Sequence, residues 1–449
     1  MSIDLENHFY DKYVTSTFDI IYSLSKALDL VNPLINDHHQ RVAFIAGSIA
    51  KEAGYSEDEI EDIILASLVH DIGVVVEKEF HELVNDEEQY ECELSHVLVG
   101  SFLMKDLHFF PNIPKLIKYH HTPYRIEKNL IDENEEVPET SNIIHLADRI
   151  DIALKRDVPA LDQREKVTDK IKNYSPNKFN PAHVEAFLRL ADREHFWFEI
   201  EEHDKYPLIK YNFHFSHIDM TMDDALEMSR LLSRIIDFRC IFTSTHSAGV
   251  ATVAYTVAEL MGMSPDECKA AKIAGYLHDI GKLAIPSYIL YKTDKLTPEE
   301  SLILKKHPYY TYRILNSFQI FETIIDWASY HHEKLNGKGY PFHLHEDKLS
   351  KGCRILAVAD IFTALSEERP YRKSESKENL TALLKKLAEQ NELDHDVINT
   401  FIDNFDIISQ KRQKAQNKAS EEFSMFCKNV FSNNVCKSNI TYVSVLTAD

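Results

Sequence analysis

The sequence predicts an all-α protein built from two tandem helical-bundle domains. Three observations support this prediction: only 11 glycines occur in 449 residues, apolar residues recur at helical spacing almost throughout, and one set of motifs occurs twice in the same order. A chain of this length also exceeds the roughly 100 to 200 residues of one ordinary domain. Two hydrophobic cores are therefore expected.

The first repeated feature is an amphipathic helix followed by a second helix. The apolar stripes are Val42, Ile45, Ala46, Ile49 and Ala50 in the first half, and Val250, Val253, Ala254, Val257 and Leu260 in the second. Gly54 and Gly262 are placed to end these helices, and Ser56 and Ser264 each begin an S-x-x-E capping box. Both following helices lead into the tetrapeptide His-Asp-Ile-Gly.

The spacing of histidines and aspartates confirms an internal repeat. The separations are 32 residues for His38 to His70 and for His246 to His278, 28 for His120 to Asp148, and 29 for His331 to Asp360. We predict an N-terminal domain over 1–200, a connector over 201–227, a catalytic domain over 228–408 and a C-terminal tail over 409–449.

Composition excludes several classes of protein. With 72 acidic and 50 basic side chains, the net charge of −22 repels polyanions and argues against a general nucleic-acid or membrane-surface binder. The six cysteines form no C-x-x-C pair, so neither a zinc ribbon nor a disulfide framework is indicated. No segment approaches the roughly 18 to 20 apolar residues of a membrane span, and the first residues do not resemble a secretion signal. A cytoplasmic location is expected.

Histidine is unusually frequent, with 23 residues, and imidazole is a common ligand of transition metals. The candidate ligands of the second half are His246, His278, Asp279, His307, His331, His332 and Asp360. Seven nitrogen and oxygen donors exceed what one tetrahedral ion uses, which favours two divalent ions, iron or manganese before zinc. Two such ions could activate a shared water for hydrolysis of a phosphodiester.

The second half resembles the HD-GYP branch of the HD phosphohydrolase superfamily. The matching motifs are His278-Asp279-Ile280-Gly281-Lys282, His331-His332-Glu333, Asn336-Gly337-Lys338-Gly339-Tyr340-Pro341, and Ala359 to Leu365 running into Arg369-Pro370-Tyr371-Arg372. The resemblance implies hydrolysis of c-di-GMP to linear pGpG and in some members to GMP, while a subset of the family prefers 3',3'-cyclic GMP-AMP.

The resemblance also implies roles for individual residues. One ion would be held by His246, His278, Asp279 and Asp360, and Asp279 would bridge to a second ion held by His307, His331 and His332. Asp279 and Lys282 would act in catalysis, and the substrate contacts would be Lys282, Tyr340, Arg369 and Arg372. Three positions depart from the family: Phe242 replaces a glutamate that recruits a third metal in some members, and Asn336 and Thr363 each replace an aspartate. Because Phe242 replaces the glutamate that recruits the third metal, two ions are expected.

The first half retains the ligand types in order: His38, His70, Asp71, His96, His120, His121 and Asp148. A further metal site is predicted there. Val74 stands where the second half has Lys282, and no Gly-Tyr-Pro loop follows His121. The whole chain thus resembles tandem HD plus HD-GYP phosphodiesterases, and a catalytic, sensory or structural role of the first site stays open.

Other functions stay open at this stage. They are a different HD phosphohydrolase reaction, an oxygenase with two iron ions, and a non-catalytic receptor or scaffold for cyclic dinucleotides. Cyclic dinucleotides are the expected small-molecule partners, and diguanylate cyclases are candidate protein partners. The sequence does not decide the oligomeric state, for which a dimer is one alternative.

Overall fold

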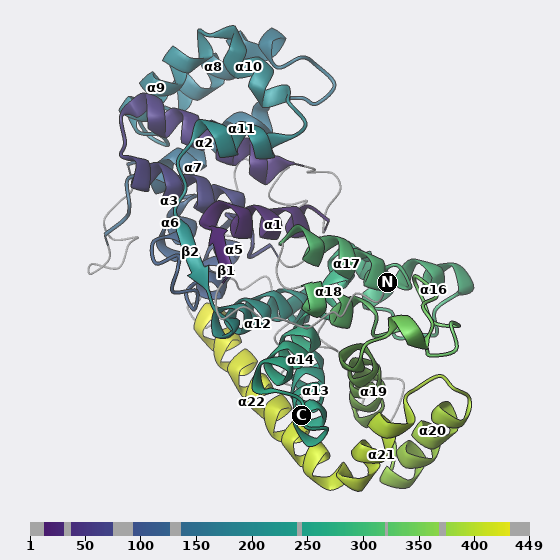
Figure 1. Cartoon of the computed structure of the whole chain (residues 1–449). Helices are drawn as coiled ribbons and strands as arrows, with labels where there is room; N and C mark the ends of the chain where they lie inside the picture. Colours follow the sequence, from purple (N-terminus) through teal and green to yellow (C-terminus); the bar gives the residue numbers. More distant parts are fainter. Residues whose placement is uncertain are drawn as a thin grey trace. The chain divides into compact units, whose positions relative to one another are not determined.

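A computed structural model describes residues 13–30, 37–74, 93–125, 136–239, 245–318, 322–367 and 374–431. They form two compact units, which we call the N-terminal unit, mainly Thr15–Ile218, and the C-terminal unit, mainly Asp219–Phe426 (Figure 1). In the described ranges, β structure is limited to one isolated bridge and a two-stranded sheet of β1 (Tyr13–Ser16) and β2 (His217–Met220). The all-α prediction is confirmed.

The N-terminal unit is a bundle in which α2 packs against α3, α7 and α9. Its helices are α1 (Thr17–Asp29), α2 (His38–Ala53), α3 (Glu57–Leu68), α5 (Glu93–Met104), α6 (Ile113–Tyr119), α7 (Ser141–Ala153), η3 (Leu161–Gln163), α8 (Arg164–Tyr174), α9 (Pro181–Ala191), α10 (Glu194–Glu201) and α11 (Lys205–Asn212).

The C-terminal unit repeats this packing, because α13 lies against α14 and α19 as α2 lies against α3 and α7. Its helices are α12 (Met222–Arg239), α13 (His246–Leu260), α14 (Pro265–Leu277), η5 (Ile280–Ala284), α15 (Ser287–Leu290), α16 (Pro298–Leu304), α17 (His307–Ser317), α18 (Glu322–Ser329), η6 (Glu346–Lys348), α19 (Lys351–Ser366), α20 (Lys377–Glu389), α21 (His395–Asp403) and α22 (Phe405–Phe431).

Local sequence signals set the ends of the paired helices. Ser56 and Ser264 both form complete capping boxes, with the side chain accepting from the third helical N–H and a glutamate returning the bond. Gly54 and Gly262 adopt positive φ values of 87° and 72°, a conformation that favours glycine. These caps set the boundary between the paired helices, and the second helix of each pair, α3 or α14, leads into a His-Asp pair.

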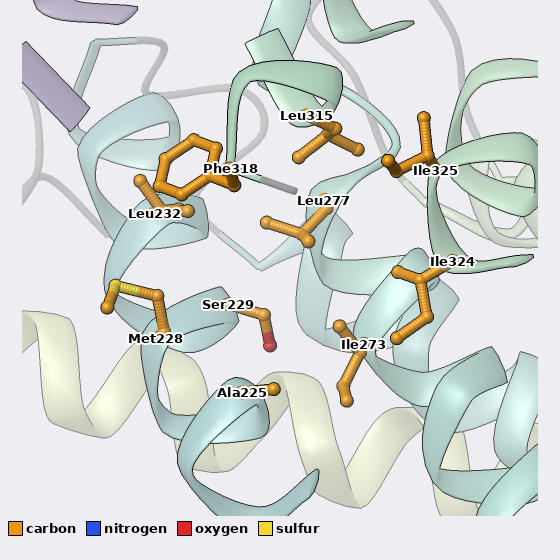
Figure 2. A pocket seen from close by; sticks show the side chains of 10 residues that line it. All are labelled: Ala225, Met228, Ser229, Leu232, Ile273, Leu277, Leu315, Phe318, Ile324 and Ile325. Carbon is orange, nitrogen blue, oxygen red and sulfur yellow. The ribbon is translucent and has the colours of Figure 1, made fainter. Parts of the chain in front are cut away.

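A small cavity of about 20 Å³ lies in the core of the C-terminal unit, between α12, α14, α17 and α18 (Figure 2). Its lining is apolar except for Ser229, whose hydroxyl donates to the carbonyl of Leu226 at 2.8 Å. The volume suits about one water molecule and no larger ligand. Leu277 points into the cavity and directly precedes His278, so this apolar core packs next to a predicted metal ligand.

The division between the units falls within the predicted connector 201–227, which contains α11, β2 and the start of α12. Helix α22 extends from Phe405 to Phe431, across the position where we predicted the tail to begin. Among the described helices, none combines the length and apolar character needed to cross a membrane.

Candidate metal centres and active site

The seven predicted ligands of the C-terminal unit are positioned by helix ends and by one helix interior. His246 begins α13, His278 and Asp279 lie between α14 and η5, His307 begins α17, His331 and His332 follow α18, and Asp360 lies within α19. All but His332 are buried. Side chains separated by more than a hundred residues thus meet in one place.

Asp279 lies at the centre of this group. Its Oδ2 is 3.2 Å from Nε2 of His278, and its Oδ1 is 3.4 Å from Nε2 of His307. Nε2 of His307 is in turn 3.4 Å from Nε2 of His331. The two carboxylate oxygens therefore face different histidines, which is the arrangement that a bridging carboxylate requires.

Asp360 faces the remaining ligands. Its Oδ1 is 3.2 Å from Nε2 of His246 and 3.9 Å from Nε2 of His278, and its Oδ2 is 3.9 Å from Nδ1 of His332. Ligand atoms fall into three overlapping groups with members within 4.8 Å of one another: His307, His331 and His332; His246, His278 and Asp360; and His278, Asp279 and His331. The structure brings all seven predicted ligands together.

The protonation of the imidazoles fits cation binding. Nδ1 of His278, His307 and His331 donates to the carbonyl three residues earlier, at 2.7–2.8 Å. Each Nε2 therefore turns a lone pair toward the cluster, the usual arrangement of a metal-ligating histidine. Burial lowers the pKa of His307 and of His331 to about 3, so both are neutral near pH 7.

Lone pairs that face each other across 3.4 Å repel unless a cation lies between them. Nε2 of His278 is also buried and accepts no hydrogen bond within the part of the chain that the structure describes. Such orphaned acceptors cost free energy in a buried site. The donor set of the C-terminal unit therefore fits divalent metal ions.

Lys282 and Tyr340 lie beside the ligands. The Lys282 ammonium donates to Oδ2 of Asp279 at 2.6 Å, and the Tyr340 ring centre is 4.8 Å from that of His332. Sequence reasoning missed Lys305, whose ammonium lies 5.3 Å from the centre of the Tyr340 ring. Lys305 lies two residues before His307 and belongs to none of the motifs that the sequence analysis identified.

Glu333 holds the Gly-Tyr-Pro loop against the paired histidines. It belongs to the motif His331-His332-Glu333, and the sequence analysis assigned it no role. The buried Glu333 carboxylate accepts from the backbone N–H of Phe342 at 2.7 Å and of Leu344 at 3.0 Å, and the Tyr340 N–H donates to the carbonyl of His332 at 3.2 Å. Because Glu333 directly follows His332, these hydrogen bonds fix the loop beside the predicted ligands.

Two of the three departures from the family lie in the described residues, Asn336 in this loop and Thr363 on α19. Asn336 shapes the turn, because its side-chain oxygen accepts from the Lys338 N–H at 3.1 Å and its amide donates to the Gln390 carbonyl at 3.2 Å. Thr363 is buried on α19. The predicted substrate residues Arg369 and Arg372, and Phe242, lie outside the described residues.

A carboxylate that the sequence analysis overlooked holds the first histidine. Nδ1 of His246 lies 3.1 Å from a carboxylate oxygen of Glu367 and donates to it. Burial disfavours the charged imidazole, but Glu367 and Asp360 together raise the pKa of His246 to about 10. Glu367 therefore fixes the ring so that Nε2 points toward Asp360.

The N-terminal unit builds a second cluster in the same way. Asp71 Oδ2 is 3.2 Å from Nε2 of His70, and Asp71 Oδ1 is 3.4 Å from Nε2 of His96. His38 Nε2 is 3.3 Å from Asp148 Oδ1. The two groups with ligand atoms within 4.8 Å are Asp71, His96, His120 and His121, and His38, His70 and Asp71. All seven predicted ligands of this unit lie in the cluster.

The second cluster differs in its accessory groups. Val74 occupies the position of Lys282, but Arg149 lies 3.1 Å from Asp148 Oδ2, so a cation contacts a predicted ligand here too. Sequence reasoning missed this arginine, although it directly follows the predicted ligand in Ala147-Asp148-Arg149. In place of Glu367, Asp151 accepts from Nδ1 of His38 at 2.7 Å.

A glycine shapes each His-Asp-x-Gly turn. A Cβ on Gly281 would lie 1.9 Å from the carbonyl oxygen of His307, and a Cβ on Gly73 would lie 2.0 Å from that of His96. These approaches are far below van der Waals contact. The glycine therefore lets the backbone after the His-Asp pair pack directly on the start of the helix that carries the next histidine.

The fold and the two clusters define an all-α protein in which each unit carries a group of residues that could hold metal ions. Residues 36–153 match one HD-domain family and residues 230–397 match another. The chain therefore belongs to the HD superfamily and carries two HD domains in tandem.

Individual relatives extend this comparison. The chain is 29% identical over 396 residues to the 3'3'-cGAMP-specific phosphodiesterase 1 of Vibrio cholerae, covering 85% of this chain and 90% of that protein. It is 39% identical over 145 residues to the cyclic di-GMP phosphodiesterase response regulator RpfG of Xanthomonas campestris, covering 32% and 38%. A solved cyclic GMP-AMP specific phosphodiesterase of Vibrio cholerae shares the fold, with a TM-score of 0.60 at 22% identity over 88% of this chain and 98% of that one.

Gly281→Ala is expected to separate the ligands without removing any of them. The added methyl group cannot fit beside the His307 carbonyl, so η5 and α17 must move apart and carry Asp279 and His307 with them. We expect at least a tenfold loss of Mn²⁺ affinity, since displaced ligands and their supports typically cost about 10- to 100-fold. Gly262→Ala is the control for lost stability, because its positive φ of 72° strains the added Cβ while nothing lies within 4 Å of that Cβ, so no ligand is displaced. Equal Mn²⁺ affinity in both variants, measured by titration, would contradict this role of the glycine.

Proposed function

We propose that this protein is a metal-dependent phosphodiesterase that hydrolyses cyclic dinucleotides, and that its C-terminal unit carries out catalysis. The observation that carries this proposal is the convergence of five imidazoles and two carboxylates beside Lys282 and the Gly-Tyr-Pro loop. The relatives support the substrate class, since the two compared above are named as phosphodiesterases of cyclic GMP-AMP and of cyclic di-GMP.

The ligands divide into two sets around Asp279. We assign His246, His278, Asp279 and Asp360 to one divalent ion, and His307, His331, His332 and the second oxygen of Asp279 to another. Two ions held there would lower the pKa of a shared water and stabilise the charge that develops on phosphoryl oxygens. Iron and manganese suit this nitrogen and oxygen donor set.

The chain's own residues then bind and orient the substrate. The Lys282 ammonium is fixed by Asp279 at 2.6 Å, so it presents a positive charge at the edge of the ligand cluster, where a phosphate would lie. The Tyr340 ring and the Lys305 ammonium, 5.3 Å from the centre of that ring, lie beside His332, so an aromatic group and a second cation are available there for a base and a phosphate. Arg369 and Arg372 are proposed as further contacts. In a protein of charge −22, these local cations are needed to hold an anionic ligand.

The cluster of the N-terminal unit is proposed to hold metal as well. Its ligands have the same relative arrangement, and Nδ1 of His70 and His120 donates to backbone carbonyls at 2.8 and 2.7 Å, which leaves both Nε2 atoms facing the cluster. The unit has no counterpart of the Gly-Tyr-Pro loop in its sequence. We therefore assign cyclic dinucleotide hydrolysis to the C-terminal unit.

The assignment of catalysis predicts different effects of matched substitutions in the two units. Asp279→Ala or His331→Ala should reduce cyclic dinucleotide turnover by at least about a thousandfold, because each removes a ligand at the shared centre. His70→Ala should leave a measurable part of the activity, since it alters the other unit. Turnover is measured on c-di-GMP and on 3',3'-cyclic GMP-AMP, with metal quantified on each sample.

His395→Ala serves as the control, because this histidine is exposed at the start of α21, away from the predicted ligands. It should retain full turnover and metal content. Total loss of activity in His70→Ala, equal to that in Asp279→Ala, would overturn the assignment to the C-terminal unit. Turnover that persists in Asp279→Ala would overturn the metal-dependent mechanism, and turnover that requires oxygen would indicate an oxygenase.

The alternative substrate is 3',3'-cyclic GMP-AMP. One observation favours it: the relative named for that substrate matches the chain across both units, whereas RpfG matches over 145 residues. We predict a kcat/KM ratio above one for the mixed ring over c-di-GMP, measured with anaerobically prepared protein. A ratio below one would assign c-di-GMP as the preferred substrate, and binding without turnover of either ring would indicate a receptor.

A further inference from the structure

Helix α22 lies beyond residues 230–397, which match the HD-domain family, yet it contributes buried polar side chains to the C-terminal unit. Arg412 and Gln416, one helical turn apart, are each only 6% exposed. Charged and amide side chains are seldom buried this deeply without a specific partner. Their contacts show what holds them there.

Gln416 is linked to the predicted metal centre by consecutive hydrogen bonds. Its Nε2 donates to Oε1 of Glu367 at 2.6 Å, and Glu367 accepts from Nδ1 of His246 at 3.1 Å. Nε2 of the same His246 ring is 3.2 Å from Oδ1 of Asp360. A side chain of α22 is thus two hydrogen bonds away from a proposed ligand.

The orientation of the Gln416 amide is fixed from both sides. Its Oε1 accepts from Nη1 of Arg412 at 2.6 Å, so its Nε2 is the end that faces Glu367. Gly249 on α13 leaves the space that the amide occupies, because a Cβ there would lie 2.9 Å from Gln416 Nε2. The Arg412 guanidinium also lies 5.5 Å from the centre of the Phe362 ring on α19. Arg412 and Gln416 therefore form an ordered polar contact with α13 and α19.

The N-terminal unit meets the same requirement with residues of its own bundle. Asp151 accepts from Nδ1 of His38 at 2.7 Å and is held by Arg41 at 2.8 Å and by Arg156. In both units, a carboxylate that follows the last metal-ligand aspartate holds the first histidine, and basic or amide donors hold that carboxylate. The C-terminal unit takes its donor from α22.

We propose that α22 is a positioning element of the C-terminal metal centre, in which Gln416 holds Glu367 and Glu367 fixes the His246 ring. This inference rests on the proposed metal centre. Partners of metal-ligating histidines typically contribute about 10- to 100-fold to metal affinity or activity. Gln416 acts one hydrogen bond further out, so a loss of roughly three- to tenfold is expected for its removal.

The test measures Mn²⁺ affinity by electron paramagnetic resonance on the full-length chain, with His70→Ala present in every arm to reduce binding at the N-terminal unit. Gln416→Leu keeps the volume and removes the donor, and it should weaken Mn²⁺ binding about three- to tenfold. Gln416→Glu should weaken it more, because two carboxylates then face each other. The exchange Gln416→Glu with Glu367→Gln restores one donor and one acceptor, and it should recover affinity relative to Gln416→Glu alone.

Gln410→Leu is the matched control, since Gln410 is an exposed glutamine on the same helix. It should leave Mn²⁺ affinity unchanged, and circular dichroism should show equal helix content in all arms. Unchanged affinity in Gln416→Leu, or no recovery in the exchange variant, would overturn the positioning role. A parent chain that binds no Mn²⁺ would instead overturn the proposed metal centre. With cyclic dinucleotide as substrate, kcat should fall in Gln416→Leu while KM stays constant.

Discussion

Facing lone pairs in a buried site are the constraint on which the rest of the structure depends. Histidines whose Nδ1 atoms donate to nearby carbonyls must turn Nε2 inward, and two such atoms, on His307 and His331, lie only 3.4 Å apart. Two lone pairs cannot donate to each other, and a cation is the group that satisfies both. The caps, the His-Asp-x-Gly turn and the helix packing all serve to hold this arrangement.

The two units show how one backbone arrangement can carry different accessory chemistry. Both place an aspartate between facing histidines, and both hold the first histidine with a carboxylate. The groups that contact the ligands differ, with Lys282 on Asp279 in one unit and Arg149 on Asp148 in the other. The positive charge therefore contacts the aspartate of the His-Asp pair in the C-terminal unit and the last predicted ligand in the N-terminal unit.

The helical fold and the ligand set could be predicted because they depend on local and repeated signals. Apolar spacing, capping boxes and His-Asp pairs recur in both halves, and a coincidence of that kind is hard to produce by packing alone. Glu367, Arg149 and Lys305 were missed because their roles depend on which helices meet in three dimensions. Gln416 was the hardest to predict. It is an amide in a polar tail, and no sequence pattern indicates a role for it before α22 packs against α13 and α19.

Anomalous diffraction at the manganese edge, from crystals of the Mn²⁺-loaded protein, tests the central claim most directly. The account predicts two peaks about 3.5 to 4 Å apart in the C-terminal unit, one beside His246 and Asp360 and one beside His307 and His331, with Asp279 between them. Fully loaded crystals with no peak within coordination distance of these side chains would contradict it.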